Sequence, residues 1–212
     1  MSRPIDTIRC FHTAFRRDIF QIDEIVYRTA REGGDFSSVL ARLHTLNELL
    51  DYHARGEEAA VFPAMEKLAP RLSMPYLLDH RELDNMVNGL EKMRQNPDPL
   101  TTARATAVLD SFLRIHLNKE DAHLYPILRE RTTDDEQVAI GALLAKSVPP
   151  GKFPTLIQWL FPLLDLEDQV FVAKGWVKVM PPQALAGISP LIQKAVEGNW
   201  VKLAERVPEL QR

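Results

Sequence analysis

One pattern occurs twice in this chain of 212 residues, and the two copies are 63 positions apart. The copies begin at His53 and His116, and both read H-x-x-x-E-[ED]-A-x-x-[FY]-P. Around each copy, apolar residues recur at steps of three and four, which is the period of a helix that buries one face. No long stretch shows the alternation expected of a strand. The duplication therefore indicates an all-α fold built from two similar helical halves.

The apolar stripes and turn residues predict four long helices, over about residues 4–31, 36–66, 75–94 and 100–130. Glycine and proline clusters mark the short connections between them. A weaker match, at an offset of 68, pairs His12 with His80. Long helices with short connections predict an up-down antiparallel four-helix bundle made of two helix pairs. Pro63 and Pro126 are expected to end their helices or to kink them.

The composition changes after residue 148. All three tryptophans and eight of the 15 prolines lie beyond this point. We therefore expect two domains, a bundle over residues 1–148 and a small C-terminal helical subdomain over residues 149–212. The second shows no catalytic spacing, and we expect it to pack on the bundle, on a second copy of the chain or on a protein partner.

The charge and cysteine content exclude several classes of function. The 26 basic and 29 acidic residues give a net charge of −3, which provides no broad basic field for nucleic acid or an anionic membrane. The most apolar stretch, residues 153–164, is shorter than the ~20 residues of a membrane span. With no secretory signal apparent and Cys10 as the single cysteine, we expect a cytoplasmic protein without disulfides.

Six ionisable residues fall on stripes that should face the bundle axis. A histidine and a glutamate four residues apart project together from a helix, which applies to both copies of the pattern. The two histidines of the weaker match lie on similar apolar faces. The six candidate metal ligands are His12, His53, Glu57, His80, His116 and Glu120.

Burying two carboxylates without a partner costs several kcal/mol. A pair of divalent cations bridged by the carboxylates, with imidazoles in the outer positions, removes this cost. Fewer than six protein ligands per ion leaves room for a small molecule, which favours iron over a closed structural zinc site. The alternative interpretation is a duplicated bundle that has lost its metal and buries a polar network.

Four neighbouring residues are candidates for a supporting role or for alternative ligands. Glu58 and Asp121 are expected to be solvated or to hold imidazole N–H groups, with direct coordination as the alternative. Helix geometry favours Glu120 over Asp121 as a ligand, because a residue five positions after a histidine is turned about 140° away. His123 lies on the stripe, but Ala60 is its counterpart in the repeat, so we expect it to line the site or support a ligand.

Residues 4–130 resemble the hemerythrin family, also known as the HHE cation-binding domain. The resemblance implies a four-helix bundle that holds two iron ions in a non-haem centre. It also implies a role in carrying or sensing dioxygen, in handling iron, or in binding nitric oxide or peroxide. Matched by position, the family's metal ligands correspond to the six candidate residues above.

Two positions depart from the oxygen-carrying members of that family. Tyr76 stands where those proteins have a further histidine, and this tyrosine can be a ligand, can donate a hydrogen bond or can simply pack. The carriers also place their last carboxylate five residues after a histidine, which would select Asp121. The missing histidine favours sensing or iron handling over reversible dioxygen carriage.

Three functions follow from these patterns. A di-iron protein that binds a small diatomic molecule, peroxide or iron is favoured over an enzyme, because only Tyr52, Tyr76 and Tyr125 suggest proton donors. A di-metal oxidoreductase acting on peroxide is the first alternative. The second is a metal-bearing scaffold whose residues 149–212 form a homodimer or bind a protein partner.

Overall fold

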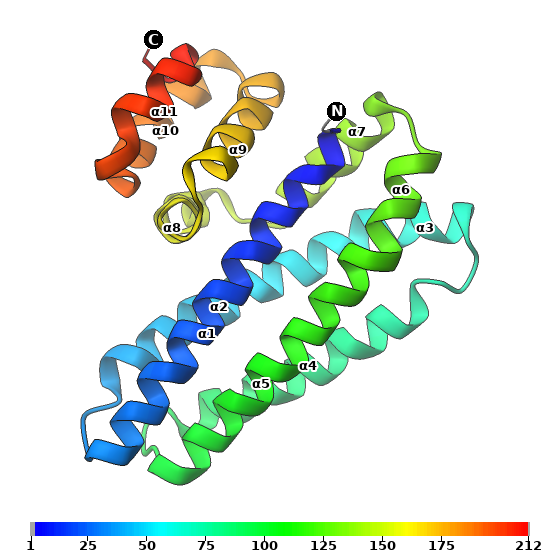
Figure 1. Cartoon of the computed structure of the whole chain (residues 1–212). Coiled ribbons are helices and arrows are strands. Elements are labelled where there is room, and N and C mark those ends of the chain that lie inside the picture. The colour runs from blue at the N-terminus through cyan, green and yellow to red at the C-terminus, as the bar shows by residue number, and fades with distance from the viewer. Residues whose placement is uncertain (1–2, 212) are drawn as a thin grey trace.

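The computed structural model describes residues 3–211, and these contain helices and no strand, which confirms the all-α prediction. Residues 1–2 and 212 of the two predicted domains lie outside the described residues. Four long rods run up and down beside one another (Figure 1). They comprise a 3₁₀ turn Pro4–Thr7 with α1 (Ile8–Glu32); α2 (Ser37–Gly56), a π-helical segment Glu57–Val61 and α3 (Phe62–Leu68); α4 (Met74–Met93); and α5 (Pro99–Lys119), a π-helical segment Glu120–Leu124 and α6 (Tyr125–Arg131).

The rods are held together by apolar side chains at helical spacing. On α1, Phe15, Ile19 and Ile22 are almost completely buried, and they pack in one core with leucines of α2 and α5. Gly33 ends α1 in a left-handed conformation, with φ of 76°, and its N–H donates to the carbonyl of Thr29 over 3.0 Å. These features produce the antiparallel bundle that the sequence predicts.

Each copy of the duplicated pattern contains a π-helical segment directly before its proline. The N–H of Phe62 donates to the carbonyl of Glu57, and the N–H of Tyr125 donates to that of Glu120. A proline has no N–H for the carbonyl four residues back, and the widened turn accommodates this loss. Pro63 and Pro126 therefore end neither rod, since α3 and α6 continue beyond them.

A further helix, α7 (Asp134–Ala145), follows the bundle and has no counterpart among the predicted helices. Thr133 and Glu136 cap its N-terminus reciprocally. The helix packs against the segment Glu57–Val61. Gly56 permits this approach, because an added Cβ would lie 2.9 Å from the Oγ of Ser147.

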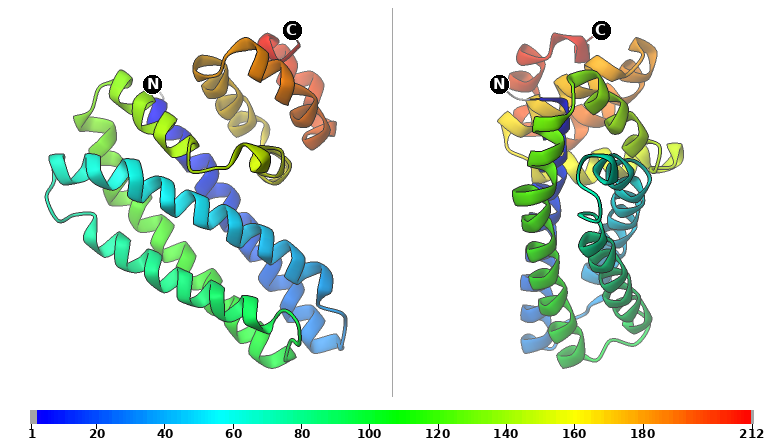
Figure 2. Two further views of the ribbon diagram at one scale, coloured as in Figure 1. Left: turned by 180° about the vertical axis from the view of Figure 1, so that it is seen from behind. Right: turned by 90° about the vertical axis from the view of Figure 1, so that its right-hand side faces the viewer.

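The C-terminal segment forms four short helices, α8 (Phe153–Leu160), α9 (Leu166–Val179), α10 (Pro182–Ala195) and α11 (Trp200–Arg206). They lie beside α1, on the side away from α4 and α5 (Figure 2). Trp159 packs on Phe15 with the rings tilted and their centroids 4.7 Å apart, and its Nε1 donates to the buried carboxylate of Asp18 over 2.6 Å. The apolar core is continuous between the two parts. The segment therefore packs on the bundle, while the boundary at residues 148 and 149 stays a prediction.

Among the described residues, no helix combines the length and the apolar character that a membrane span requires.

Candidate metal centre

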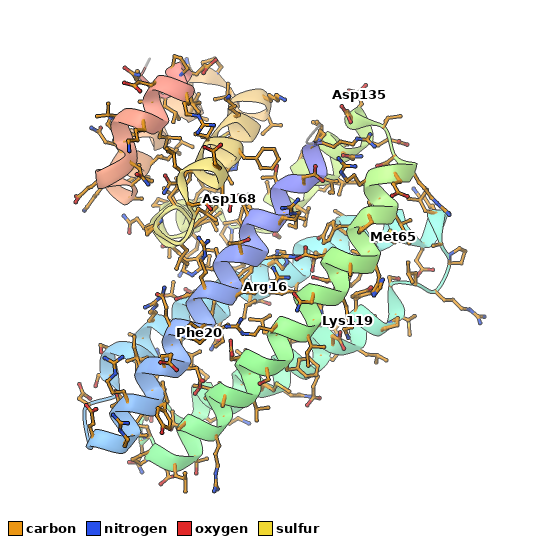
Figure 3. The ribbon with its side chains drawn as sticks, viewed as in Figure 1. Arg16, Phe20, Met65, Lys119, Asp135 and Asp168 are labelled. Carbon is orange, nitrogen blue, oxygen red and sulfur yellow. The ribbon has the colours of Figure 1, made fainter. Side chains whose placement is uncertain are left out.

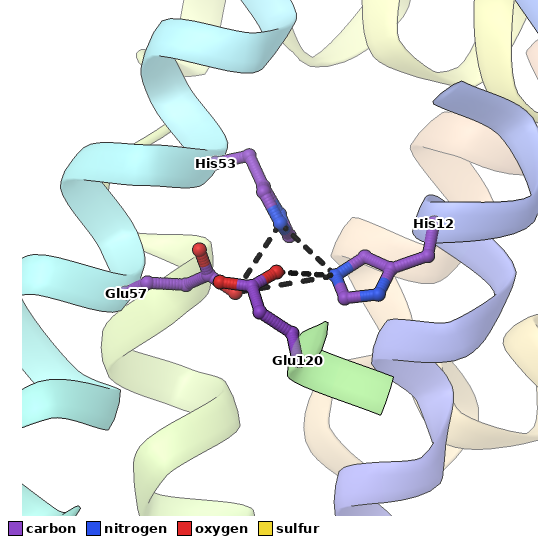
Figure 4. A group of neighbouring side chains, drawn as sticks. All are labelled: His12, His53, Glu57 and Glu120. Carbon is purple, nitrogen blue, oxygen red and sulfur yellow. Dashed lines mark hydrogen bonds and ion pairs between the residues drawn. The ribbon is translucent and has the colours of Figure 1, made fainter. Parts of the chain in front are cut away.

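Six ionisable side chains meet inside the bundle. The structure brings together His12 of α1, His53 of α2, His80 of α4, His116 of α5, and Glu57 and Glu120, which begin the two π-helical segments. Five of the six are at most 2% exposed, and the side chain of His53 is 7% exposed. Figure 4 shows four of them pointing toward one another from three rods.

The six side chains form two overlapping groups. One ligand atom from each of His12, His53, Glu57 and Glu120 lies within 4.8 Å of the others. The same is true of His80 and His116 with the two glutamates. Each group therefore has its own pair of imidazoles, and the groups share both carboxylates.

The two oxygens of each shared carboxylate face different imidazole pairs. For Glu57, Oε1 lies 3.3 Å from His53 Nε2, and Oε2 lies 3.3 Å from His80 Nε2. For Glu120, Oε2 lies 3.6 Å from His12 Nε2, and Oε1 lies 3.3 Å from His116 Nε2. This is the orientation that a carboxylate needs to bridge two ions.

Several atoms at the centre are buried and make no hydrogen bond with the described part of the chain. They are Oε2 of Glu57, both carboxylate oxygens of Glu120 and Nε2 of His80. Buried polar atoms without partners are costly, and they are rare in folded proteins. Carboxylate oxygens and imidazole nitrogens are also suitable donors for divalent transition metals. The residues present therefore fit a pair of cations.

Without cations, the two glutamates cannot both ionise easily. Burial and the negative charge of Glu57 raise the pKa of Glu120 well above its usual value. Burial also acts to raise the pKa of Glu57, but the imidazoles of His53 and His80 outweigh it and hold that pKa well below the usual value. Without a cation, burial and charge therefore favour one charged and one protonated glutamate.

The imidazoles of His12 and His116 are neutral at physiological pH. Burial lowers the pKa of both, and that of His116 falls to about 4. At His80 burial acts in the same direction, but the carboxylates of Glu57 and Glu58 outweigh it and raise the pKa. Neutral imidazole is the form that binds a metal ion, so His12 and His116 are ready to coordinate without losing a proton.

Three imidazoles have a carboxylate next to Nδ1, the ring nitrogen that faces away from the centre. His12 Nδ1 lies 2.8 Å from Asp121 Oδ1, and His80 Nδ1 lies 3.1 Å from Glu58 Oε1. His116 Nδ1 lies 3.2 Å from Asp79 Oδ2. An Nδ1–H that donates to a carboxylate leaves the Nε2 lone pair facing the centre.

These three carboxylates are themselves paired with basic side chains. The partners are Arg16 for Asp121, Arg81 for Glu58 and Lys119 for Asp79. Arg16 on α1 and Lys119 on α5 are labelled in Figure 3. At Asp121, burial acts to raise the pKa, but the hydrogen bonds from His12 and Arg16 outweigh it and lower the pKa. At Asp121 the basic partner therefore favours the charged carboxylate that contacts His12.

Glu120 and Asp121, the two alternatives for the second carboxylate, face different ways. Glu120 is fully buried at the centre, whereas Asp121 lies behind His12. Glu58 occupies the matching place behind His80. The structure thus puts Glu58 and Asp121 where a residue supports an imidazole and puts Glu120 where a bridging residue would lie.

Tyr76 and His123 lie outside the cluster. The hydroxyl of Tyr76 donates to the main-chain carbonyl of Lys119 over 3.2 Å. His123 is exposed, so the expectation that it lines the site or supports a ligand is wrong. The two turns also differ in their surroundings: Ala60, at the matching position, is buried in the segment on which α7 packs, whereas His123 is in solvent.

Two aromatic residues at matching positions of the repeat pack on the cluster. Phe62 stacks on His80 with ring centroids 5.2 Å apart, and Tyr125 meets His12 edge-on at 5.6 Å. Tyr125 is buried, and its hydroxyl donates to Oε1 of Glu57. Burial and the nearby glutamates raise the pKa of Tyr125 well above its usual value, so this hydroxyl keeps its proton.

The sequence gives little indication of the role of Asp79. Glu58 and Asp121 occupy matching positions in the repeat, but Asp79 lies outside the duplicated pattern. Its approach to His116 depends on how α4 packs against α5.

A four-helix bundle whose core contains two imidazole pairs and two shared carboxylates defines a class of helical cation-binding protein. The sequence model of the Hemerythrin HHE cation binding domain matches residues 3–128, and the chain belongs to this family. The resemblance found from the duplicated pattern is thereby confirmed, and the protein is a metal-binding protein.

Two curated relatives come from Arabidopsis thaliana. A zinc finger protein described as BRUTUS-like is 23% identical over 188 residues, which cover 84% of this chain and 15% of that protein. Zinc finger protein BRUTUS is 21% identical over 193 residues, covering 86% of this chain and 15% of its own length. Both alignments cover more of this chain than residues 3–128, so the similarity continues into the C-terminal helices. No solved structure is a significant match to the chain.

Proposed function

We propose that the six clustered residues bind two iron ions. In this proposal Glu57 and Glu120 bridge the ions, His12 and His53 bind one of them, and His80 with His116 bind the other. The observation that supports it best is the orientation of the carboxylates, which direct one oxygen to each imidazole pair. Four protein donors per ion leave coordination positions free if the ion is octahedral iron.

We propose further that the centre binds a small exogenous molecule, namely dioxygen, nitric oxide or peroxide, or that it handles iron itself. Bound iron would supply Lewis acidity and redox chemistry. The residues of the chain do the rest: Asp121, Glu58 and Asp79 orient the imidazoles, and the apolar core around them limits the access of water. Family membership supports cation binding, and a donor set of four residues per ion would leave room for a small ligand.

Metal analysis after anaerobic loading with Fe(II) tests this proposal. We expect two irons per chain in the wild type and fewer than one in Glu57→Ala or Glu120→Ala, because each substitution removes a donor from both ions. Glu24→Ala is the matched control, since Glu24 is exposed on α1 and does not line the centre. A wild-type protein that folds normally and retains no transition metal would contradict the proposal.

An enzyme that turns over peroxide is the second candidate function, and Tyr125 is the observation that favours it. This buried hydroxyl donates a hydrogen bond to Oε1 of Glu57 within the cluster, and it could donate one in the same way to a reacting oxygen. Peroxide turnover that falls in Tyr125→Phe, with iron content unchanged, would support an enzyme over a binding protein. Unchanged turnover would remove the argument for Tyr125.

A further inference from the structure

A small cavity lies beside the imidazoles, between α2, α4 and α5. Its volume is about 40 Å³, and we refer to it as the side cavity. Three imidazoles border it, those of His53, His80 and His116, and Asn47 borders it as well. Most of the remaining lining is leucine and valine. A single water needs roughly 10–15 Å³ of such space, so the side cavity has room for a molecule of two or three heavy atoms.

Asn47 is the unusual residue in this lining. It is only 7% exposed, and neither its Nδ2 nor its Oδ1 has a hydrogen-bond partner in the described part of the chain. A buried amide with neither donor nor acceptor satisfied lowers stability, and such groups need an explanation. An occupant of the side cavity would provide one, because it can reach both the amide and the imidazoles.

The chemistry of the amide limits what this occupant can be. Oδ1 requires a donor, and Nδ2 requires an acceptor. Dioxygen and nitric oxide offer acceptors alone, whereas hydrogen peroxide has two heavy atoms and both donates and accepts. Two exposed carboxylates, Asp51 and Asp84, also border the side cavity, but they accept hydrogen bonds only and are paired with Arg55 and Arg81.

We infer that the side cavity is the binding pocket for the exogenous ligand and that the amide of Asn47 selects hydrogen peroxide. This inference rests on the proposed function, because the imidazole end of the side cavity is where the ligand would meet the centre. Asn47 is then a specificity-determining residue that acts through two hydrogen bonds. In the described part of the chain, no hydrogen bond joins its amide to any of the six clustered side chains.

The test compares two probes on oxidised, iron-loaded protein. Hydrogen peroxide and azide are titrated at low temperature, and their dissociation constants are read from the absorption spectrum. Asn47→Leu should weaken peroxide binding roughly tenfold through the lost hydrogen bonds, and should weaken azide binding less because azide offers acceptors alone. Thr102→Val is the matched control, since Thr102 is another buried side chain whose hydroxyl lacks a partner, and it does not line the side cavity.

Thermal unfolding of the metal-free variants provides a second measurement. Asn47→Leu should melt no lower than the wild type, because the substitution removes a buried amide without partners. Val87→Phe, a change on the half-buried wall of the side cavity, should weaken both probes alike by filling the space. This second variant keeps the test decisive if Asn47→Leu does not fold.

Three results would overturn the inference. The first is unchanged peroxide affinity in Asn47→Leu with normal iron content, and the second is equal weakening of both probes in that variant. The third is normal binding of both probes in Val87→Phe. Failure of the wild type to take up iron would overturn the proposed function itself, so the two failures are distinguishable.

Discussion

At the residue scale, the centre depends on carboxylates that are adjacent in sequence and face opposite ways. Glu57 and Glu120 face the four imidazoles, while Glu58 and Asp121, the next residues, lie behind His80 and His12. Successive residues on a helix are turned by about 100°. One carboxylate of a neighbouring pair can therefore face Nε2 of an imidazole while the next faces Nδ1 of the same ring. The acidic doublets in the repeat therefore have two distinct tasks.

Asp79→Asn tests whether the outer carboxylates tune the centre. The substitution keeps the shape of the side chain but removes the charge that faces Nδ1 of His116 and Lys119. We expect iron affinity to fall roughly ten- to a hundredfold, although no proposed ligand is lost. Competition with a chelator measures the change.

Glu82→Gln on the same helix serves as the control, because Glu82 is exposed and its carboxylate accepts a hydrogen bond from the side chain of Asn85. Equal iron affinity in Asp79→Asn and the wild type would show that this carboxylate is incidental.

The candidate centre could be predicted largely because the sequence presents its signal twice. His53, Glu57 and their counterparts recur at one offset, and helix periodicity alone places them on one face. Asp79 and Asn47 lie outside that pattern. The role of Asp79 arises from the packing of α4 on α5, and the proposed role of Asn47 arises from the side cavity between α2, α4 and α5. Contacts between rods cannot be deduced from spacing along one rod, and this explains why both residues were missed.

At the scale of single elements, the π-helical segments position the shared glutamates. Both segments begin at such a glutamate and run up to the aromatic residue that precedes the proline. The proline, which cannot donate to the carbonyl four residues back, disfavours a regular α-turn there. We therefore expect each proline to maintain the widened turn that holds its glutamate in place.

Pro126→Ala should convert this turn toward a regular helix. Ala at position 126 would have an N–H for the carbonyl of Ala122, and metal-free stability should rise by up to about 3 kcal/mol. Iron affinity should fall, because loss of the extra residue rotates Glu120 relative to α6. Urea unfolding of the metal-free protein and chelator competition measure the two effects.

Pro154→Ala is the control, since Pro154 occupies the first turn of α8, where a missing N–H costs little. If Pro126→Ala left iron affinity at the wild-type level, the proline would have no part in shaping the centre.

The rods were predictable, but α7 was not, and the difference lies in burial. The four rods present continuous apolar stripes, whereas α7 buries only Gln137 and Ile140 and leaves Val138 and Leu143 exposed. A helix that buries so little has no stripe for periodicity to detect. The π-helical segments were missed for another reason, because proline in a helix more often signals an end or a kink.

At the scale of the whole molecule, the C-terminal helices contact the residues that surround the centre. Phe15 on α1 lies between Trp159 of α8 and the imidazole of His53, with ring centroids 4.7 Å and 5.2 Å away. Trp159 also donates to Asp18, whose buried carboxylate accepts from Arg42 over 2.6 Å. A single aromatic side chain thus connects the C-terminal helices with a proposed ligand.

Trp159→Phe should lower the free energy of unfolding by about 1–3 kcal/mol at neutral pH, because Asp18 loses one of its donors. Burial raises the pKa of Asp18, and losing this hydrogen bond should raise it further. The part of the deficit that comes from the carboxylate is therefore absent below the ordinary aspartate pKa near 4 and grows as the pH rises through the folded pKa of Asp18. Urea unfolding at several pH values measures it.

Trp200→Phe is the comparison, because Trp200 is half-buried on α11, away from Asp18. A deficit in Trp159→Phe that did not change with pH would mean that lost packing, and not the carboxylate, is responsible.

Removing the metal should destabilise the entire bundle. An ion present at a thousand times its dissociation constant raises the free energy of unfolding by about 4 kcal/mol. For a chain of this size that corresponds to roughly 10 °C in melting temperature. Calorimetry of iron-loaded and metal-free protein measures the difference. Identical melting temperatures would show that the cluster is uncoupled from folding.

The sharing of Glu57 and Glu120 makes the two halves of the duplication interdependent. The first hairpin contributes His12, His53 and Glu57, and the second contributes His80, His116 and Glu120. In the proposed centre either hairpin alone supplies three donors, and the fourth for each cation would come from the other hairpin. A single hairpin of this kind could therefore complete a site of four donors only by pairing with a second hairpin.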